Sequence, residues 1–272
     1  MSRLPKTFER LNREKRAAFI TFITGGDPDF ETSLKILKGL PAAGADIIEL
    51  GMPFTDPSAD GPSIDKAAQR ALASGGSLKN TLKMVAEFRH DDQETPIVLM
   101  GYFNPVYTYG IESFSTDAAE AGVDGLIIVD LPPEEDEELR GPANTAGLDV
   151  VRLITPTSDD ERIQTIVDGA SGFVYYVAVA GITGAQSSTA QIAGDAVQRI
   201  KKHTDLPVAI GFGIRTQEQA REMAKVCDAA VVGSAIVETI AADLDKNGKA
   251  SVETASKTLE FVKSLAAGVR SA

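Results

Sequence analysis

The chain has 272 residues, of which 43% are hydrophobic and 24% are charged, a composition typical of soluble globular proteins with a sizeable core. Its formal net charge of −12 argues against nucleic-acid or anionic-membrane partners, which favour a basic face. Cys227 is the only cysteine, so no intrachain disulfide can form. The first residues lack an apolar leader, and no run approaches the ~18 apolar residues of a membrane span, so we expect a cytoplasmic protein.

Short β-rich runs alternate with amphipathic helical stretches along the chain. The expected strands are residues 18–24, 47–51, 97–102, 125–130, 150–155, 173–179, 208–212 and 229–233. The expected helices include residues 29–43, 78–90, 134–146, 188–202, 217–225 and 252–265, with N-caps at Ser77 and Thr216. Strands separated by helices pair in parallel, and eight such units predict an α/β fold, a single (β/α)₈ TIM barrel over residues 1–272. Extra helices are expected between the second and third strands, divided at Gly75-Gly76.

The second expected strand holds a carboxylate, Glu49, between the apolar residues Ile48 and Leu50. The active site of a TIM barrel lies at the C-terminal ends of its strands, where Glu49 falls. Strand alternation allows the Glu49 side chain to face the barrel interior. Placing its carboxyl group there costs less free energy than burying it unpaired in the apolar layer beneath the helices. We expect burial there to raise its pKa, which suits a group that takes and gives a proton near pH 7. The alternative is a structural glutamate paired with an arginine.

Two further carboxylates, Asp56 and Asp60, follow this strand in a loop. Asp60 precedes Gly-Pro, so by itself it also fits a turn-capping residue. No lysine ends an expected strand, which argues against a Schiff-base aldolase. The only histidines, His90 and His203, lie in polar sequence at helix ends, so we expect surface residues and no histidine-based metal site.

Glycine-rich segments end the sixth, seventh and eighth expected strands, at residues 181–184, 211–214 and 233–234. Glycine lets backbone N–H groups approach an anion closely, and barrels often hold phosphate in these loops, so the pattern favours a phosphate site over plain turns. Large apolar side chains on the same strands could line a flat pocket or belong to the core: Phe22, Met100, Tyr102, Val129, Leu153, Tyr175 and Phe212.

The run from Glu49 to Pro62, Glu-Leu-Gly-Met-Pro-Phe-Thr-Asp-Pro-Ser-Ala-Asp-Gly-Pro, closely resembles the signature of the tryptophan synthase alpha subunit family. Further matches follow in the family's order: Phe-Ile-Thr-Gly-Gly-Asp-Pro at 22–28, Tyr-Phe-Asn-Pro at 102–105, Asp-Leu-Pro at 130–132, Ala-Gly-Ile-Thr-Gly at 180–184, Gly-Phe-Gly-Ile at 211–214 and Val-Val-Gly-Ser-Ala at 231–235. The resemblance implies cleavage of indole-3-glycerol phosphate to indole and glyceraldehyde 3-phosphate, without a cofactor in this chain.

The same resemblance assigns roles by position. Glu49 would be the acid/base, and Asp60 would accept a hydrogen bond from the indole N–H and stabilise positive charge on the ring. Thr183 would orient Asp60 from a mobile loop. Residues that would flank the indole are Phe22, Met100, Tyr102, Val129, Leu153 and Tyr175. Residues that would hold the phosphate are Gly184, Phe212, Gly213, Gly233 and Ser234.

Members of this family pair with a pyridoxal-phosphate-dependent beta subunit that consumes the indole, usually as two alpha and two beta chains. The positions that match partner-facing residues are Pro53, Asp56, Asn104 and Pro132. The chain departs from many members at Ala178-Val179, where they have Ser-Arg, so loop closure or partner signalling could differ. Three alternatives stay open: a standalone lyase that releases free indole, another phosphosugar barrel enzyme, and an inactive barrel that serves only as a partner subunit.

Overall fold

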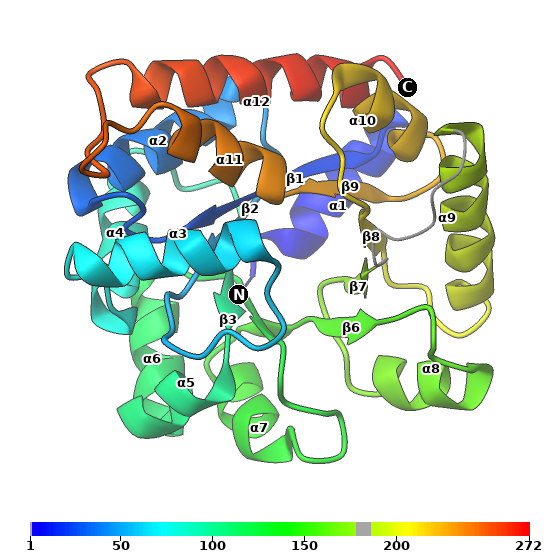
Figure 1. Cartoon of the computed structure of the whole chain (residues 1–272). Helices are drawn as coiled ribbons and strands as arrows, with labels where there is room; N and C mark the ends of the chain where they lie inside the picture. The colour runs from blue at the N-terminus through cyan, green and yellow to red at the C-terminus, as the bar shows by residue number, and fades with distance from the viewer. Residues whose placement is uncertain (1, 178–185) are drawn as a thin grey trace.

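The computed structural model describes residues 2–177 and 186–272, and it confirms the predicted barrel (Figure 1). All of its paired strands run parallel, in the order β5-β4-β3-β2-β1-β9-β8-β7-β6. The strands are β1 Ala18–Thr24, β2 Ile47–Gly51, β3 Ile97–Gly101, β4 Gly125–Ile128, β5 Asp149–Val150, β6 Arg152–Ile154, β7 Val174–Val177, β8 Val208–Gly211 and β9 Ala229–Val232. The first two have the bounds predicted from the sequence, and the others end one to two residues earlier where their described ends can be compared.

The strand expected at 150–155 is instead two short strands that meet at Val151, and in this respect the prediction of eight continuous strands is wrong. β5 pairs only with β4, whereas β6 pairs only with β7. The Val151 N–H still donates to the Leu126 carbonyl oxygen at 2.9 Å, but the ladder to β4 goes no further. The barrel is therefore nearly closed. β5 and β6 are the two end strands of the sheet, and they follow each other directly in the chain without pairing with each other.

Strand alternation divides the apolar side chains into two layers. One set of each strand faces the barrel interior, for example Ile20, Ile47, Val98 and Ala209. The other set packs beneath the surrounding helices in the larger core. Because Glu49 has the parity of Ile47, it lies in the interior layer, as predicted from the sequence.

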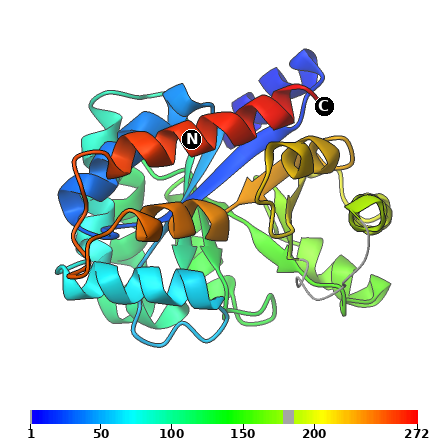
Figure 2. The ribbon, with the colours of Figure 1, turned by 45° about the horizontal axis from the view of Figure 1, so that its top comes forward.

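The helices cover the outside of the barrel and close one of its ends (Figure 2). Their bounds are α1 Leu4–Glu14, α2 Phe30–Ala43, α3 Pro62–Ala73, α4 Leu78–Arg89, α5 Phe103–Tyr109, α6 Ile111–Ala121, α7 Glu137–Thr145, α8 Asp160–Val167, α9 Gln186–Ile200, α10 Gln217–Ala224, α11 Ser234–Ala242 and α12 Thr254–Arg270. Two helices, α3 and α4, do separate β2 from β3. The predicted N-caps are confirmed, since Ser77 accepts from the Asn80 N–H and Thr216 forms a capping box with Gln219. No helix in the described ranges is long and apolar enough to cross a membrane.

Helix α1 lies against the N-terminal end of the barrel, opposite the expected active-site end. Its residues Leu4, Phe8 and Leu11 join the interior apolar layer, and the Phe8 ring lies 6.0 Å from the ring of Phe173, just before β7. These contacts close the end of the barrel that takes no part in the site.

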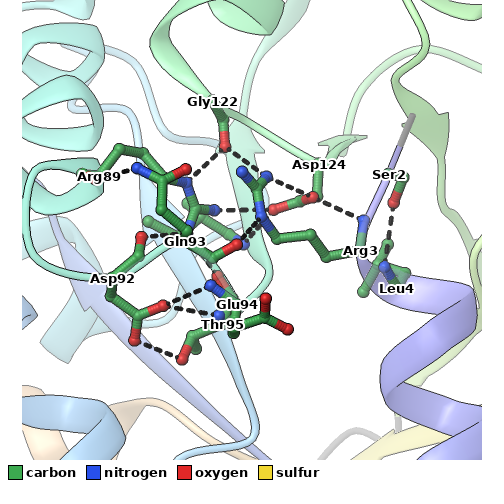
Figure 3. A network of polar contacts seen from close by, with 11 residues as sticks. Ser2, Arg3, Leu4, Arg89, Asp92, Gln93, Glu94, Thr95, Gly122 and Asp124 are labelled. Atoms are coloured by element: carbon green, nitrogen blue, oxygen red, sulfur yellow. Dashed lines mark hydrogen bonds and ion pairs between the residues drawn. The ribbon is translucent and has the colours of Figure 1, made fainter.

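A network of charged groups around Asp124 ties this end together (Figure 3). Asp124 is fully buried just before β4, and its carboxylate accepts from Arg89 at 2.9 Å and from both the backbone and the side chain of Arg3 at 2.8 and 3.0 Å. It also accepts from the Ile97 N–H at the start of β3 at 2.8 Å. Burial lowers the pKa of Arg89 to about 10, opposed by the Asp124 charge. A buried charge needs such partners, so this network fixes α1, α4, β3 and β4 relative to one another.

Candidate active site

A cavity of about 190 Å³ opens among the C-terminal ends of β1, β2, β3, β7, β8 and β9. It brings together both candidate carboxylates, apolar side chains and the loops after β8 and β9. Its lining residues are Phe22, Glu49, Asp60, Ile64, Met100, Tyr175, Gly211, Gly213, Ile214, Arg215, Val231, Gly233, Ser234 and Ala235. This is the end of the barrel where the sequence predicts the active site.

Glu49 is the buried carboxyl group of the cavity. It is 1% exposed, and its Oε1 atom has no hydrogen-bond partner among the described residues. Burial alone raises its pKa to about 8, because nothing described nearby offers the charged form a compensating partner. The expected interior position and raised pKa are thus found, and the alternative of a pairing arginine is not seen within the described part of the chain. At neutral pH the group is a protonated acid, ready to donate a proton.

Asp60 enters the same cavity from the loop between β2 and α3. Burial raises its pKa to about 6, and the Tyr102 hydroxyl opposes this rise. The same hydroxyl accepts a hydrogen bond from the Ala59 N–H at 2.9 Å, so Tyr102 fixes the loop beside Asp60. Asp60 is therefore ionised at neutral pH while Glu49 is not, and the two carboxyl groups can take different roles.

Two strand-end glycines make room for aromatic rings in the cavity. A Cβ atom on Gly51 would lie 2.7 Å from the Phe22 ring, and one on Gly211 would lie 2.5 Å from the Tyr175 hydroxyl oxygen. Any larger residue at either position would push these rings out of place. Tyr175 is buried, and both burial and the charge of Glu49 hold its pKa well above the usual range, so it stays a neutral phenol.

The amino terminus of α11 opens onto the cavity. The N–H groups of Ile236 and Val237 donate to the Gly233 carbonyl oxygen at 2.9 and 3.1 Å, while Ser234 and Ala235 come before them and line the cavity. The first N–H groups of a helix have no acceptor within it, and the helix dipole favours a nearby anion. This wall of the cavity suits a small anionic group such as phosphate.

The predicted pocket residues do not all reach this cavity. Phe22, Met100 and Tyr175 line it, whereas Tyr102 and Val129 line an adjoining hollow that also contains Phe22, Met100 and Asp60. Leu153 lies in the interior layer but borders a different hollow, where β4 and β6 diverge.

Among the predicted phosphate residues, Gly213, Gly233 and Ser234 line the cavity, whereas the side chain of Phe212 does not. The Phe212 ring packs with the outer core and borders a hollow against α10, so of the two readings offered by the sequence, pocket or core, its side chain follows the second. It has the parity of Val208 and Ile210, which face the helices. The remaining predicted residues, Thr183 and Gly184, lie outside the described residues, as does the Ala178-Val179 pair.

Sequence reasoning missed several residues of the cavity. Ile64 enters from the first turn of α3, and Arg215 enters from the loop after β8. The alternation of Ala209 and Gly211 along β8 could have indicated that strand's inner face. Nothing in the sequence pattern indicates Arg215, because it lies beyond the strand in irregular backbone.

The four partner-facing candidates lie in loops or at a helix start beyond these strand ends. Asp56, Asn104 and Pro132 are exposed, whereas Pro53 is buried within the chain. The start of α5, which holds Asn104, is joined to the segment before Pro132 by a hydrogen bond of 2.8 Å from the Phe103 N–H to the Asp130 carboxylate.

A protonated buried acid and a neighbouring carboxylate can together perform proton transfer, so the fold and the cavity have the features of an acid–base enzyme built on a barrel. The family model described as tryptophan synthase alpha chain matches residues 8–268. The chain belongs to this family, whose members cleave indole-3-glycerol phosphate and need no cofactor of their own.

Solved structures agree with this assignment. The tryptophan synthase subunit alpha from Legionella pneumophila str. Paris is 36% identical, with a TM-score of 0.91 and 100% of both chains covered. A chain of the tryptophan synthase from M. tuberculosis, in an open form with BRD0059 bound, is 35% identical, with a TM-score of 0.86 and 99% of both chains covered.

Proposed function

We propose that Glu49 and Asp60 carry out the reaction of this lyase family, the retro-aldol cleavage of indole-3-glycerol phosphate to indole and glyceraldehyde 3-phosphate. The observation that carries the proposal is the pair of pKa values in one cavity, about 8 for Glu49 and about 6 for Asp60. Between these values Glu49 is protonated and Asp60 is an ionised carboxylate. Enzymes that transfer protons near neutral pH need this division.

Glu49 begins the reaction as the acid. It donates its proton to C3 of the indole ring, and the ring nitrogen becomes a positively charged iminium. The Glu49 carboxylate then removes the proton of the glycerol hydroxyl next to the breaking bond. The carbon–carbon bond breaks, its electron pair returns to the indole ring, and the hydroxyl carbon becomes the aldehyde. The proton balance closes with Glu49 protonated again.

Asp60 stabilises the charge that this sequence of steps creates. Its carboxylate accepts a hydrogen bond from the indole N–H, and the attraction grows as the ring nitrogen becomes positive. An iminium within the substrate accepts the electrons of the broken bond, so the step needs no lysine Schiff base. Phe22, Met100 and Tyr175 flank the ring, and Gly213, Gly233 and Ser234 hold the phosphate with the dipole of α11.

The family implies a beta-subunit partner, and we propose that it docks where Asp56, Asn104 and Pro132 are exposed beside the cavity. In this assembly of two alpha and two beta chains, pyridoxal phosphate belongs to the beta subunit, which consumes the indole. The free thiol of Cys227 suits a reducing compartment, so the cytoplasm is the proposed location.

Indole release from indole-3-glycerol phosphate by the purified chain tests this function, with and without a beta subunit. The variants Glu49→Gln and Asp60→Asn should lose nearly all release, because each removes a group that moves a proton or stabilises charge. Glu120→Gln, on the exposed face of α6, is the matched control and should behave as wild type. Release that the partner leaves unchanged would instead indicate a standalone lyase, and no release under either condition would refute the catalytic proposal.

A further inference from the structure

Arg215 is a cavity residue to which neither the family's motifs nor the mechanism gives a role. It lies in the loop between β8 and α10, two residues after Gly213, and its side chain is 56% exposed at the mouth of the cavity. Both terminal nitrogens of its guanidinium contact the Glu238 carboxylate, Nη2 at 3.0 Å from Oε1. The Ser63 hydroxyl of α3 donates to the same carboxylate oxygen at 2.7 Å. The Glu238 carboxylate thus binds two side chains, those of Arg215 and Ser63, whereas the Arg215 guanidinium binds Glu238.

The charges around the cavity make Arg215 distinctive. Among its described lining residues, Arg215 is the only cation, while Glu49 and Asp60 are acidic. The whole chain carries a formal charge of −12, so its long-range field opposes the approach of a phosphate dianion. Backbone N–H groups and a helix dipole supply only partial charges against that field. A full positive charge at the mouth of the cavity would attract the phosphate more strongly than these partial charges do.

The helix geometry sets Arg215 within reach of the proposed phosphate position. Glu238 follows Ser234 by four residues on α11, so the two side chains lie on one face of the helix. Four residues correspond to a rise of about 6 Å along the axis. A guanidinium that Glu238 holds therefore lies roughly one helical turn from the N–H groups at the start of α11.

We propose that Arg215 is a substrate-binding side chain that turns from Glu238 to the phosphate of the bound substrate. The inference rests on the proposed function, because it takes the start of α11 as the phosphate position. A dianionic phosphate accepts the two parallel N–H bonds of a guanidinium as well as a carboxylate does, and it carries more charge. Glu238 keeps its bond to Ser63 after Arg215 leaves, so exchange of partners does not strand a carboxylate. Glu238 then orients Arg215 at the mouth and competes with the phosphate for it.

Two variants with opposite expected effects test the proposal. Arg215→Gln should raise the KM for indole-3-glycerol phosphate about tenfold and leave kcat nearly unchanged, because it removes a charge-assisted contact to a group remote from the breaking bond. Glu238→Gln should lower KM about two- to fivefold, because it removes the competitor for Arg215. Arg215→Lys should recover part of the loss, since it restores the charge. Arg10→Gln, which removes a similarly exposed arginine of α1 at the other end of the barrel, should have no effect.

Direct binding of glycerol 3-phosphate, measured by calorimetry at low and high salt, separates this inference from the proposed function. Wild type should bind the probe more tightly than Arg215→Gln, and the difference should shrink with added salt. If Arg215 and Glu238 only clamp the loop to α11, both neutral variants will weaken binding alike, which would overturn the proposal. Equal probe affinity in wild type and Arg215→Gln would also overturn it. A wild type that binds the probe in this pattern but releases no indole would refute the lyase mechanism and leave the role of Arg215 standing.

Discussion

Ionisation of Glu49 should make the stability of this protein unusually sensitive to pH. The ordinary pKa of a glutamate is near 4.5, and burial raises that of Glu49 to about 8 in the folded chain. Between these values the unfolded chain has released this proton while the folded chain keeps it. The contribution of Glu49 to stability is therefore complete below pH 4.5, falls as the pH rises, and is lost above about pH 8.

The Glu49→Gln variant isolates this effect because its amide does not titrate. At 1.36 kcal/mol for each pH unit, the interval between the two pKa values corresponds to roughly 5 kcal/mol as an upper bound. We expect the free energy of unfolding of the variant, relative to wild type, to rise by several kcal/mol between about pH 5 and pH 9. Urea denaturation of both proteins at intervals across this range measures it. Parallel pH dependences in the two proteins would refute the argument, because they would mean that Glu49 ionises in the fold as easily as in the unfolded chain.

Three further predictions concern the site and its support. Indole release should follow a bell-shaped pH profile in kcat/KM, rising as Asp60 ionises near pH 6 and falling as Glu49 ionises near pH 8; a flat profile across these values would contradict their assignment as charge-stabilising carboxylate and proton donor. Asp124→Ala should cost about 3–5 kcal/mol in urea denaturation, because it leaves the buried guanidinium of Figure 3 without its partner; a loss below about 1 kcal/mol would show that water replaces the carboxylate. Gly211→Ala should displace Tyr175, whose hydroxyl oxygen would lie 2.5 Å from the new methyl group, and should raise KM more than it lowers stability; an unchanged KM would mean that the Tyr175 ring is not part of the binding surface.

The periodicity of the chain was sufficient to predict the barrel and the inner position of Glu49. Apolar runs bounded by glycine and proline gave the strands, and the parity of Ile47 placed the carboxyl group inside. The break at Val151 was not predictable in this way, because Val150 and Leu153 continue an apolar pattern across it. The change of pairing partner there depends on neighbouring strands that the local sequence does not describe.

The cavity was predictable where strand alternation applies. Phe22, Met100 and Tyr175 share the parity of interior residues and do line the cavity. The same rule directs the Phe212 side chain outward, which decides between the pocket and the core positions that its residue type alone left open. Arg215 lies beyond the ladder, where backbone direction is set by the turn at Gly213, whose φ is +63°. Loop residues of this kind need coordinates before their neighbours can be named.

The placement of α1 has a consequence for synthesis of the chain on the ribosome. This helix precedes every strand in the sequence, yet its apolar face packs against walls that include Phe173. At 5–20 residues per second, roughly 170 residues must follow Leu4 before that wall exists, a delay of about 10–30 s. During this interval Leu4, Phe8 and Leu11 have only part of their native surroundings, such as Ile20 and Ile47, so some of the apolar face of α1 stays uncovered. The helix that is made first thus completes its packing only after most of the barrel has been made.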